Sequence, residues 1–204
     1  MHKAILFILV ILFILSSHVK SQDSSRLCFT SAAGLLFPLK KFASSYTTSL
    51  AFNSGIEYKI WQSFYVQFLL DFNSVKYNQQ IKENNSSYLF QKTTSSIFMT
   101  GLNLGKKFKL EASKKAMISI YAGAGFINIG EPRLNVDLNT NIIEQNIKRK
   151  SGLFVKSGTR LSYKTKSKFL QTIYIDGSYW TSNLTVQQSK PQAISLYLGT
   201  RIGF

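Results

Sequence analysis

The sequence predicts an all-β protein: an eight-stranded antiparallel up-and-down transmembrane β-barrel preceded by a signal peptide. Three observations lead to this fold class. Eight segments alternate apolar and polar side chains with a period of two. The connections between these segments alternate strictly between short and long. The chain also opens with a short apolar leader that is followed by polar residues.

The leader, residues 1–21, is predicted to be a cleaved secretory signal peptide, which leaves residues 22–204 as one barrel domain. A basic start at Lys3 precedes an apolar run of twelve residues, from Ala4 to Leu15. A helix that spans a bilayer needs about 20 apolar residues, so this run is too short for one. An uncleaved membrane anchor is the alternative interpretation.

The eight predicted strands follow in order along the chain: 29–37, 47–60, 64–77, 94–108, 116–129, 150–163, 168–180 and 193–204. The third has the clearest alternation, with Phe68 and Leu70 on an apolar face and Asp71 on the other. The sixth is the weakest, because Ser157 and Thr159 fall on its otherwise apolar face. A strand of about 9–11 residues is long enough to cross a bilayer in a closed barrel.

The connections predict which end of the barrel faces which side of the membrane. Ranges 61–63, 109–115 and 164–167 are short, whereas 38–46, 78–93, 130–149 and 181–191 are longer and polar. Tight periplasmic turns and long extracellular loops are typical of outer-membrane barrels. We also expect an aromatic belt near each rim. The residues assigned to the two belts are Trp61, Phe64, Phe108, Tyr163, Phe169 and Phe204 at one rim and Phe72, Tyr77, Tyr179 and Trp180 at the other.

The interior is predicted to hold buried ion pairs in two layers. The low layer contains Glu57, Arg160 and Arg201, and the high layer contains Asp71, Lys156 and Asp176. Lys156 and Asp176 are expected to be neighbours across the sixth and seventh strands, with Tyr65, Tyr174 and Tyr197 filling gaps. Isolated buried charges cost several kcal/mol, so each needs a partner. The alternative interpretation of these charges is a narrow ion path or a substrate slot.

Composition limits the chemistry that this chain can perform. The net charge of +16 arises from scattered lysines and arginines, which together with the predicted export argues against a nucleic-acid partner. The basic turns either contact anionic lipid headgroups or are simply solvated. His2 and His18 are the only histidines and both lie in the leader, so histidine catalysis and histidine metal sites are not expected. Cys28 is a lone cysteine, so no disulfide framework is expected either. We therefore expect no enzyme activity and no cofactor, although an Asp71–Asp176 mechanism stays open.

The last strand ends in Arg201-Ile202-Gly203-Phe204 and resembles the closing strand of bacterial outer-membrane β-barrels. In those proteins the final aromatic residue, here Phe204, is read by the barrel-assembly machinery. The chain as a whole resembles the small OmpA/OmpX-like outer-membrane barrels. This resemblance implies a place in the bacterial outer membrane, among lipid and lipopolysaccharide, but it carries over no catalytic site. Outer-membrane barrel enzymes are known for a catalytic histidine, which this chain lacks after residue 18.

Three functions follow as hypotheses. The first is an integral outer-membrane barrel with a filled lumen and a structural or surface-interaction role, exerted through the extracellular loops 78–93 and 130–149. The second is a small pore for ions or solutes. The third is a soluble secreted ligand-binding barrel of the lipocalin type. The Gly-x-Trp signature of lipocalins is absent around both Trp61 and Trp180.

Overall fold

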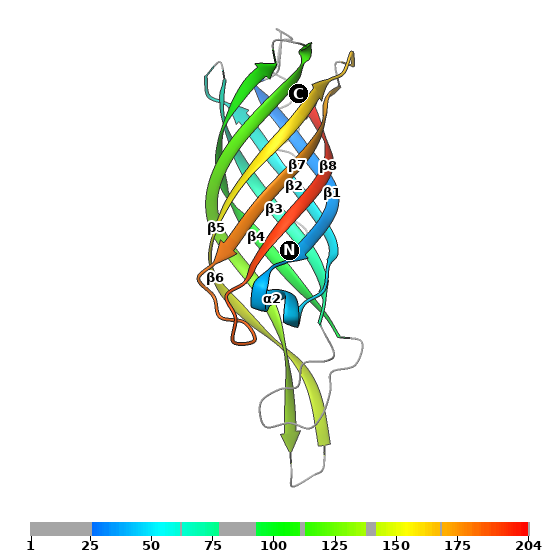
Figure 1. Cartoon of the computed structure of the whole chain (residues 1–204), viewed down its shortest axis with the longest axis vertical. Coiled ribbons are helices and arrows are strands. Elements are labelled where there is room, and N and C mark those ends of the chain that lie inside the picture. Colours follow the sequence, from blue (N-terminus) through cyan, green and yellow to red (C-terminus); the bar gives the residue numbers. More distant parts are fainter. Residues whose placement is uncertain are drawn as a thin grey trace, which may run out of the picture.

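The computed structural model describes residues 26–61, 63–77, 93–110, 113–137, 142–167 and 169–203. They form a closed barrel in which each strand pairs antiparallel with its sequence neighbours (Figure 1). The strands are β1 (Leu27–Pro38), β2 (Ser49–Lys59), β3 (Phe64–Lys76), β4 (Thr94–Leu110), β5 (Ser113–Asp137), β6 (Ile142–Lys164), β7 (Leu170–Ser182) and β8 (Gln192–Gly203). The predicted fold class is confirmed. The predicted signal peptide and Phe204 lie outside the described residues.

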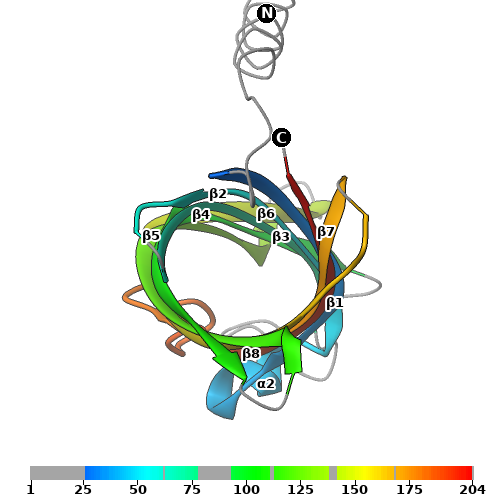
Figure 2. The same ribbon diagram turned by 90° about the horizontal axis from the view of Figure 1, so that it is seen from above.

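The first and last strands close the barrel. β1 pairs with β8 from Cys28↔Gly203 to Pro38↔Ala193, and Figure 2 shows the resulting ring from above. Closure gives every strand a partner on both sides. In hydrocarbon this matters because an unpaired backbone N–H or C=O group costs several kcal/mol.

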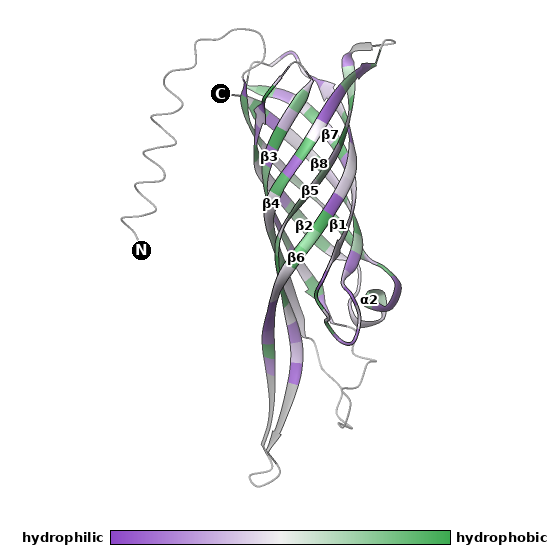
Figure 3. Cartoon of the chain, turned by 90° about the vertical axis from the view of Figure 1, so that its left-hand side faces the viewer, coloured by the Kyte–Doolittle hydropathy of each residue, from purple (hydrophilic) through white to green (hydrophobic). Residues whose placement is uncertain are grey.

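The outer surface of the barrel is apolar because alternate residues of every strand point away from the interior. Leu102, Leu104 and Leu198 are each more than half exposed. In Figure 3, hydrophobic and hydrophilic residues alternate along the strands of the wall. Exposed aromatic side chains lie toward both ends of this surface: Tyr58, Trp61, Phe64, Phe108, Tyr163 and Phe169 toward one end and Phe52, Phe72, Phe98, Phe126 and Tyr179 toward the other.

Two residues of the second predicted belt do not belong to it. Tyr77 is 3% exposed and Trp180 is fully buried, so both side chains lie inside rather than on the lipid-facing surface. Trp180 is adjacent to the exposed Tyr179 in the sequence, and the period of two sends neighbouring side chains to opposite faces.

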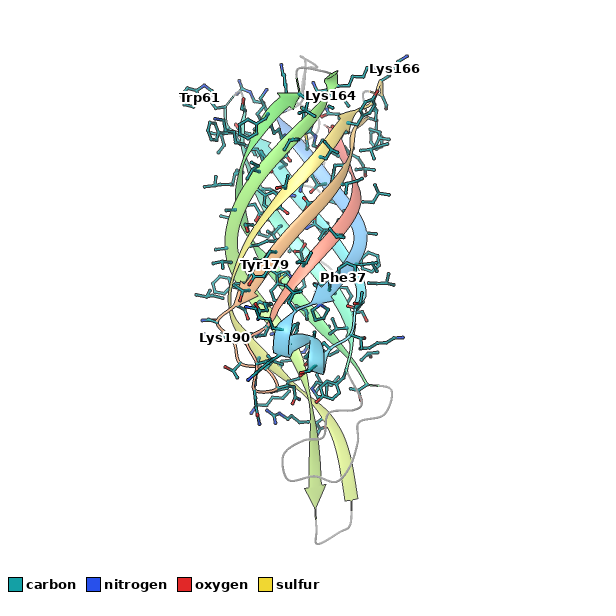
Figure 4. All side chains as sticks on the ribbon, in the orientation of Figure 1. Phe37, Trp61, Lys164, Lys166, Tyr179 and Lys190 are labelled. Atoms are coloured by element: carbon teal, nitrogen blue, oxygen red, sulfur yellow. The ribbon has the colours of Figure 1, made fainter. Side chains whose placement is uncertain are left out.

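The two ends of the barrel differ in their connections. At one end, which we call the turn end, the connections are short and carry Trp61, Lys164 and Lys166 (Figure 4). At the other, the hairpin end, β5 and β6 stay paired as far as Asp137↔Ile142. The prediction that residues 130–149 form a long polar connection is therefore wrong for most of this range, which continues the two paired strands. At about 3.4 Å per residue, this extension projects on the order of 25 Å beyond the apolar wall.

The connection between β1 and β2 contains a short helix, α2 (Lys40–Ser45), which packs beside β1 and β8 at the hairpin end (Figure 1). Among the described residues, no helix has the length and apolar character needed to cross a membrane.

Glycines on the inner face make room for tyrosine rings from neighbouring strands. A Cβ atom at Gly158 would lie 2.5 Å from the hydroxyl oxygen of Tyr121, and one at Gly199 would lie 2.5 Å from Cζ of Tyr174. Gly105 lies under the ring of Tyr65 in the same way. Each ring can thus lie flat over a neighbouring backbone and fill a narrow interior.

Candidate functional site

The strongest concentration of charge in the described interior is around Glu57 on β2. Its carboxylate is 2% exposed and pairs with Lys107 from β4, with Arg160 from β6 at 3.4 Å and with Arg201 from β8 at 3.1 Å. Strands from three sides of the ring therefore converge on one carboxylate. Arg201 also donates from Nη2 to Oγ1 of Thr172 at 3.0 Å.

Arg160 connects Glu57 to a second carboxylate. Its Nε donates to Oδ2 of Asp176 at 2.9 Å, and the hydroxyl of Tyr121 donates to Oδ1 of the same residue at 2.6 Å. The guanidinium carbon of Arg160 lies 4.3 Å from the ring centroid of Tyr174. Charge pairing and ring stacking together hold the guanidinium, which fits the planar, weakly hydrated chemistry of arginine.

A separate ion pair lies closer to the hairpin end, since Asp71 is four residues beyond Gln67, the β3 partner of Glu57. Lys156 Nζ is 2.7 Å from Oδ2 of Asp71, and the amide of Asn53 donates to the other oxygen of the same carboxylate. All three residues are buried, and Lys156 Nζ lies 5.6 Å from the ring centroid of Tyr197. Seven side chains make up what we call the central network: Glu57, Asp71, Lys107, Lys156, Arg160, Asp176 and Arg201.

The structure brings the six charged residues named from the sequence into the interior, with one pairing different from that predicted. The expected neighbours Lys156 and Asp176 are not partners, since the register places Lys156 opposite Trp180 and Arg160 opposite Asp176. Asp176 therefore joins Glu57 and Arg160 instead of the layer that contains Asp71. The error came from counting along β6 and β7 from their turn without knowing the register.

Sequence reasoning missed Lys107, which was not among the charged residues predicted to lie inside the barrel. The signal was present, because Lys107 continues the inward series of Asn103 and Gly105 at a spacing of two. Its neighbour Lys106 lies on the outer face. Counting Lys107, the central network has four cations and three carboxylates.

The hairpin end of the interior has the opposite character. Buried apolar side chains from α2 and from strands around the ring pack there, and we call this group the apolar cluster. Its members include Leu36, Phe42, Tyr46, Val75, Tyr77, Ile97, Met99, Ile127, Ile129, Phe154, Trp180 and Val186. Phe42 reaches in from α2, with its ring centroid 4.8 Å from that of Tyr46 and 6.3 Å from that of Trp180.

A buried carboxylate, Glu131 on β5, ties together the connections at the hairpin end. It lies 2.7 Å from Lys150 Nζ and 3.0 Å from Arg133 Nη2, and it accepts a 2.7 Å hydrogen bond from the backbone N–H of Gln187. Lys150 also donates to the carbonyl of Thr185 at 2.7 Å. The segment between β7 and β8 is thus bound to the β5–β6 extension.

The geometry around Gln187 shows how closely this contact is held. Gln187 and Gln188 have φ values of 48° and 58°, in the left-handed region that side chains other than glycine rarely adopt. Val186 and Ser189 exchange backbone hydrogen bonds of 2.9 and 3.0 Å across this turn. Burial alone raises the pKa of the Glu131 carboxyl, but Lys150, the Gln187 N–H group and Arg133 outweigh it and hold the pKa below its usual value.

The first connection joins the same assembly. The hydroxyl of Tyr46, just after α2, donates to the carbonyl of Gly130 at 3.0 Å, and Ser95 Oγ donates to the same carbonyl at 2.5 Å. We call this assembly of α2, the 183–191 segment and the β5–β6 extension around Glu131 the cap. It covers the apolar cluster from the hairpin end.

The part of the chain that the structure describes contains no candidate metal-binding cluster. No three His, Cys, Asp or Glu side chains there lie close enough together to hold a metal ion. The carboxylates of the central network are bound by lysine and arginine instead.

Together these features define the class of protein: a small up-and-down barrel with an apolar outside and charged residues paired inside. No protein-family model and no curated protein matches the chain. Among solved structures, it is similar to Neisserial surface protein A (NspA), with 15% sequence identity and a TM-score of 0.57. That match covers 90% of this chain and 100% of the other.

Two further solved structures are more distant. The N-terminal β-barrel domain of Pseudomonas aeruginosa OprF has 13% identity and a TM-score of 0.45, and Ail, the attachment invasion locus protein of Yersinia pestis, has 12% and 0.48. Each match covers 88% of this chain and 99% of the other. The closed eight-stranded ring and the match to NspA show that the chain has the fold of the small outer-membrane β-barrels.

Proposed function

We propose that this protein is an integral protein of the bacterial outer membrane with a filled, non-conducting lumen and no catalytic activity, which acts through its hairpin end at the cell surface. The proposal is based on two features found in one molecule: an apolar outer wall that is compatible with lipid, and a cap that projects beyond this wall. In this orientation the hairpin end is extracellular and the turn end is periplasmic, as in outer-membrane barrels generally.

The interior contacts support a filled lumen. The central network crosses the ring from β2 to β4, β6 and β8. Beyond it, toward the hairpin end, Val75, Ile97 and Ile129 of the apolar cluster are fully buried. An eight-stranded barrel has an interior that is just wide enough for side chains to fill. A permeating ion would have to pass both a paired charge layer and an apolar layer.

The composition of the cap supports a role in surface interaction. Exposed cations lie on it from several segments: Lys40, Lys41, Lys148, Arg149 and Lys190. Figure 4 shows Lys190 at this end of the barrel. Lipopolysaccharide is rich in phosphate, so its headgroups have the charge that these side chains attract. We therefore propose lipopolysaccharide as the first partner of the extracellular end; most of the 78–93 segment lies outside the described residues.

Membrane insertion is tested by Leu70→Arg. Leu70 lies on the outer face of β3, and a cation near the bilayer midplane costs roughly 2–4 kcal/mol. We expect the variant to fold less completely into phospholipid vesicles than wild type, measured as the heat-modifiable band on gels. Lys76→Arg, at the end of β3, is the matched control. Normal folding of Leu70→Arg, or recovery of the wild-type protein from a detergent-free supernatant, would contradict the proposal and favour a secreted barrel.

The filled lumen is tested in planar bilayers. We expect no stepwise conductance from the refolded wild-type protein. Steady conductance that disappears on substituting residues of the central network would favour a pore instead.

The surface role is tested by substituting Lys148 and Arg149 with glutamine. Both are exposed on the β5–β6 extension, so folding should be unaffected. We expect weaker binding of lipopolysaccharide vesicles, with Lys164 and Lys166 at the turn end substituted in the same way as the control. Equal binding by both double variants would argue against a role for the cap.

Assembly in cells tests the role proposed for Phe204. Its deletion should lower the amount of protein at the cell surface while refolding in vitro stays unchanged. Normal surface levels would remove the assembly-signal interpretation.

A further inference from the structure

Lys106 is held in an unusual place on the outer face of the turn end. Its side chain is exposed, and its Nζ lies 5.2 Å from the ring centroid of Phe64 and 5.3 Å from that of Phe108. The register explains the arrangement: Lys106 is directly opposite Phe64 on β3, and Phe108 is two residues further along β4 on the same face. The ammonium group is therefore placed between two aromatic rings.

The rings position this charge without neutralising it. A lysine near an aromatic face gains about 0.5–1 kcal/mol at exposed sites while it keeps its full charge and its N–H donors. Among the described residues, no carboxylate pairs with Lys106, whereas the adjacent Lys107 points inward and pairs with Glu57. Lys106 is thus an ordered cation that faces outward from the wall.

The apolar surface beside Lys106 fits a hydrocarbon chain. Leu104 precedes Lys106 by two residues on the same face and is 64% exposed. Ile120, the residue opposite Lys106 on β5, is 56% exposed. Phe64 and Phe108 lie near the turn end, where aromatic residues of membrane barrels meet the headgroup region. The site therefore offers a cation at headgroup depth and an apolar track that runs toward the bilayer centre.

The charge of the turn end indicates the sign of the ligand. The exposed residues Arg26, Lys109, Lys164 and Lys166 lie there (Figure 4 labels Lys164 and Lys166). Among the described carboxylates at this end, Glu57 is buried and already bound to three cations. An anionic ligand with an acyl chain matches both the cation and the apolar track.

We propose that Lys106, positioned by Phe64 and Phe108, binds the phosphate of an anionic phospholipid such as phosphatidylglycerol in the leaflet at the turn end. The acyl chain of the lipid lies along Leu104 and Ile120. This inference rests on the proposed membrane location and adds a specific lipid site to it.

The test is native mass spectrometry of the folded full chain released from vesicles that contain phosphatidylglycerol or phosphatidylcholine with identical acyl chains. We expect wild type to retain phosphatidylglycerol in preference. A juxtamembrane lysine contributes about 1 kcal/mol to binding of anionic lipid, so Lys106→Gln should retain about fivefold less. Lys166→Gln, which removes an exposed lysine that makes no cation–π contact within the described part of the chain, is the matched control and should retain nearly as much as wild type.

A second variant tests the rings themselves. Phe64→Leu combined with Phe108→Leu keeps the surface apolar and leaves the charge in place. Retention should fall about two- to fivefold if the rings position the ammonium group, in keeping with the size of cation–π interactions. Unchanged retention in this variant would overturn the role of the rings.

Other outcomes separate the alternatives. Equal losses in Lys106→Gln and Lys166→Gln would indicate diffuse attraction by the whole rim and overturn the site. Displacement of phosphatidylglycerol by millimolar inorganic phosphate would indicate a site for free phosphate and also overturn it. If wild type inserts into both kinds of vesicle without any lipid preference, this inference fails and the proposed function stands. If wild type inserts into neither, the proposed function fails and the lipid site fails with it.

Discussion

The two halves of the barrel interior lie within one closed sheet, yet they exclude water in different ways. Toward the turn end, charges from β2, β4, β6 and β8 meet around Glu57. Toward the hairpin end, Phe42 and Trp180 meet in an apolar cluster. Ion pairs are directional and need a particular register, whereas apolar packing mainly needs the correct volume. We infer that the charged half fixes which strands face each other and that the apolar half seals the interior beneath the cap.

The largest expected effect is that of Glu57→Gln in the charged half. It leaves the buried Arg160 and the partly buried Lys107 and Arg201 near one another without their shared carboxylate. Removing one partner from a buried ion pair costs roughly 3–5 kcal/mol. We expect this decrease in the free energy of unfolding in urea, measured in lipid vesicles. Tyr58→Leu, which changes the next residue on the outer face, is the control, and an equal loss in both variants would contradict a special role for the carboxylate.

In the apolar half, Ile97→Ala should cost about 2–5 kcal/mol because Ile97 is fully buried. Ile97→Leu keeps the volume and should cost less than about 1.5 kcal/mol. Leu102→Ala provides the comparison on the lipid face of the same strand, where acyl chains can fill the space, so its effect should be smaller. A cost for Ile97→Leu as large as that for Ile97→Ala would show that the apolar half also depends on exact shape.

The ion pair between Asp71 and Lys156 tests whether a buried charge pair stabilises the barrel more than two apolar side chains in its place. Lys156→Met alone should be strongly destabilising, because it leaves a buried carboxylate with only the Asn53 amide. Combined with Asp71→Leu, the loss should shrink to about 1 kcal/mol or less. Unfolding of the two single variants and the double variant gives the coupling energy. Simple additivity of the two losses would contradict the pairing.

The smallest effect is expected in the cap, on lowering the pH. The pKa of Glu131 is lower in the folded protein than in the unfolded chain, so its carboxylate contributes stability above the unfolded pKa. That contribution is lost as the pH falls through the folded pKa. Protease cleavage within 183–191 should therefore increase below the usual carboxyl range while the barrel stays folded. Glu131→Gln should show this increased cleavage at neutral pH, with no further change in acid.

The alternation of residues in the sequence was sufficient to predict the closed barrel, because a period of two decides which side of a sheet each residue faces whatever its neighbours are. It placed Glu57, Asp71, Lys156, Arg160, Asp176 and Arg201 inside. The same rule applied one step further along β4 would have added Lys107, and applied to β7 it would have moved Trp180 inside.

Partners were decided only by the tertiary structure. Register between strands depends on how the whole ring closes, so the pairing of Asp176 with Arg160 could not be read from spacing along one strand. The apolar cluster and the cap likewise join α2, β5 and the 183–191 segment, which lie far apart in the sequence. Local alternation fixes the direction of a side chain, whereas the identity of its contacts depends on elements brought together only when the barrel closes.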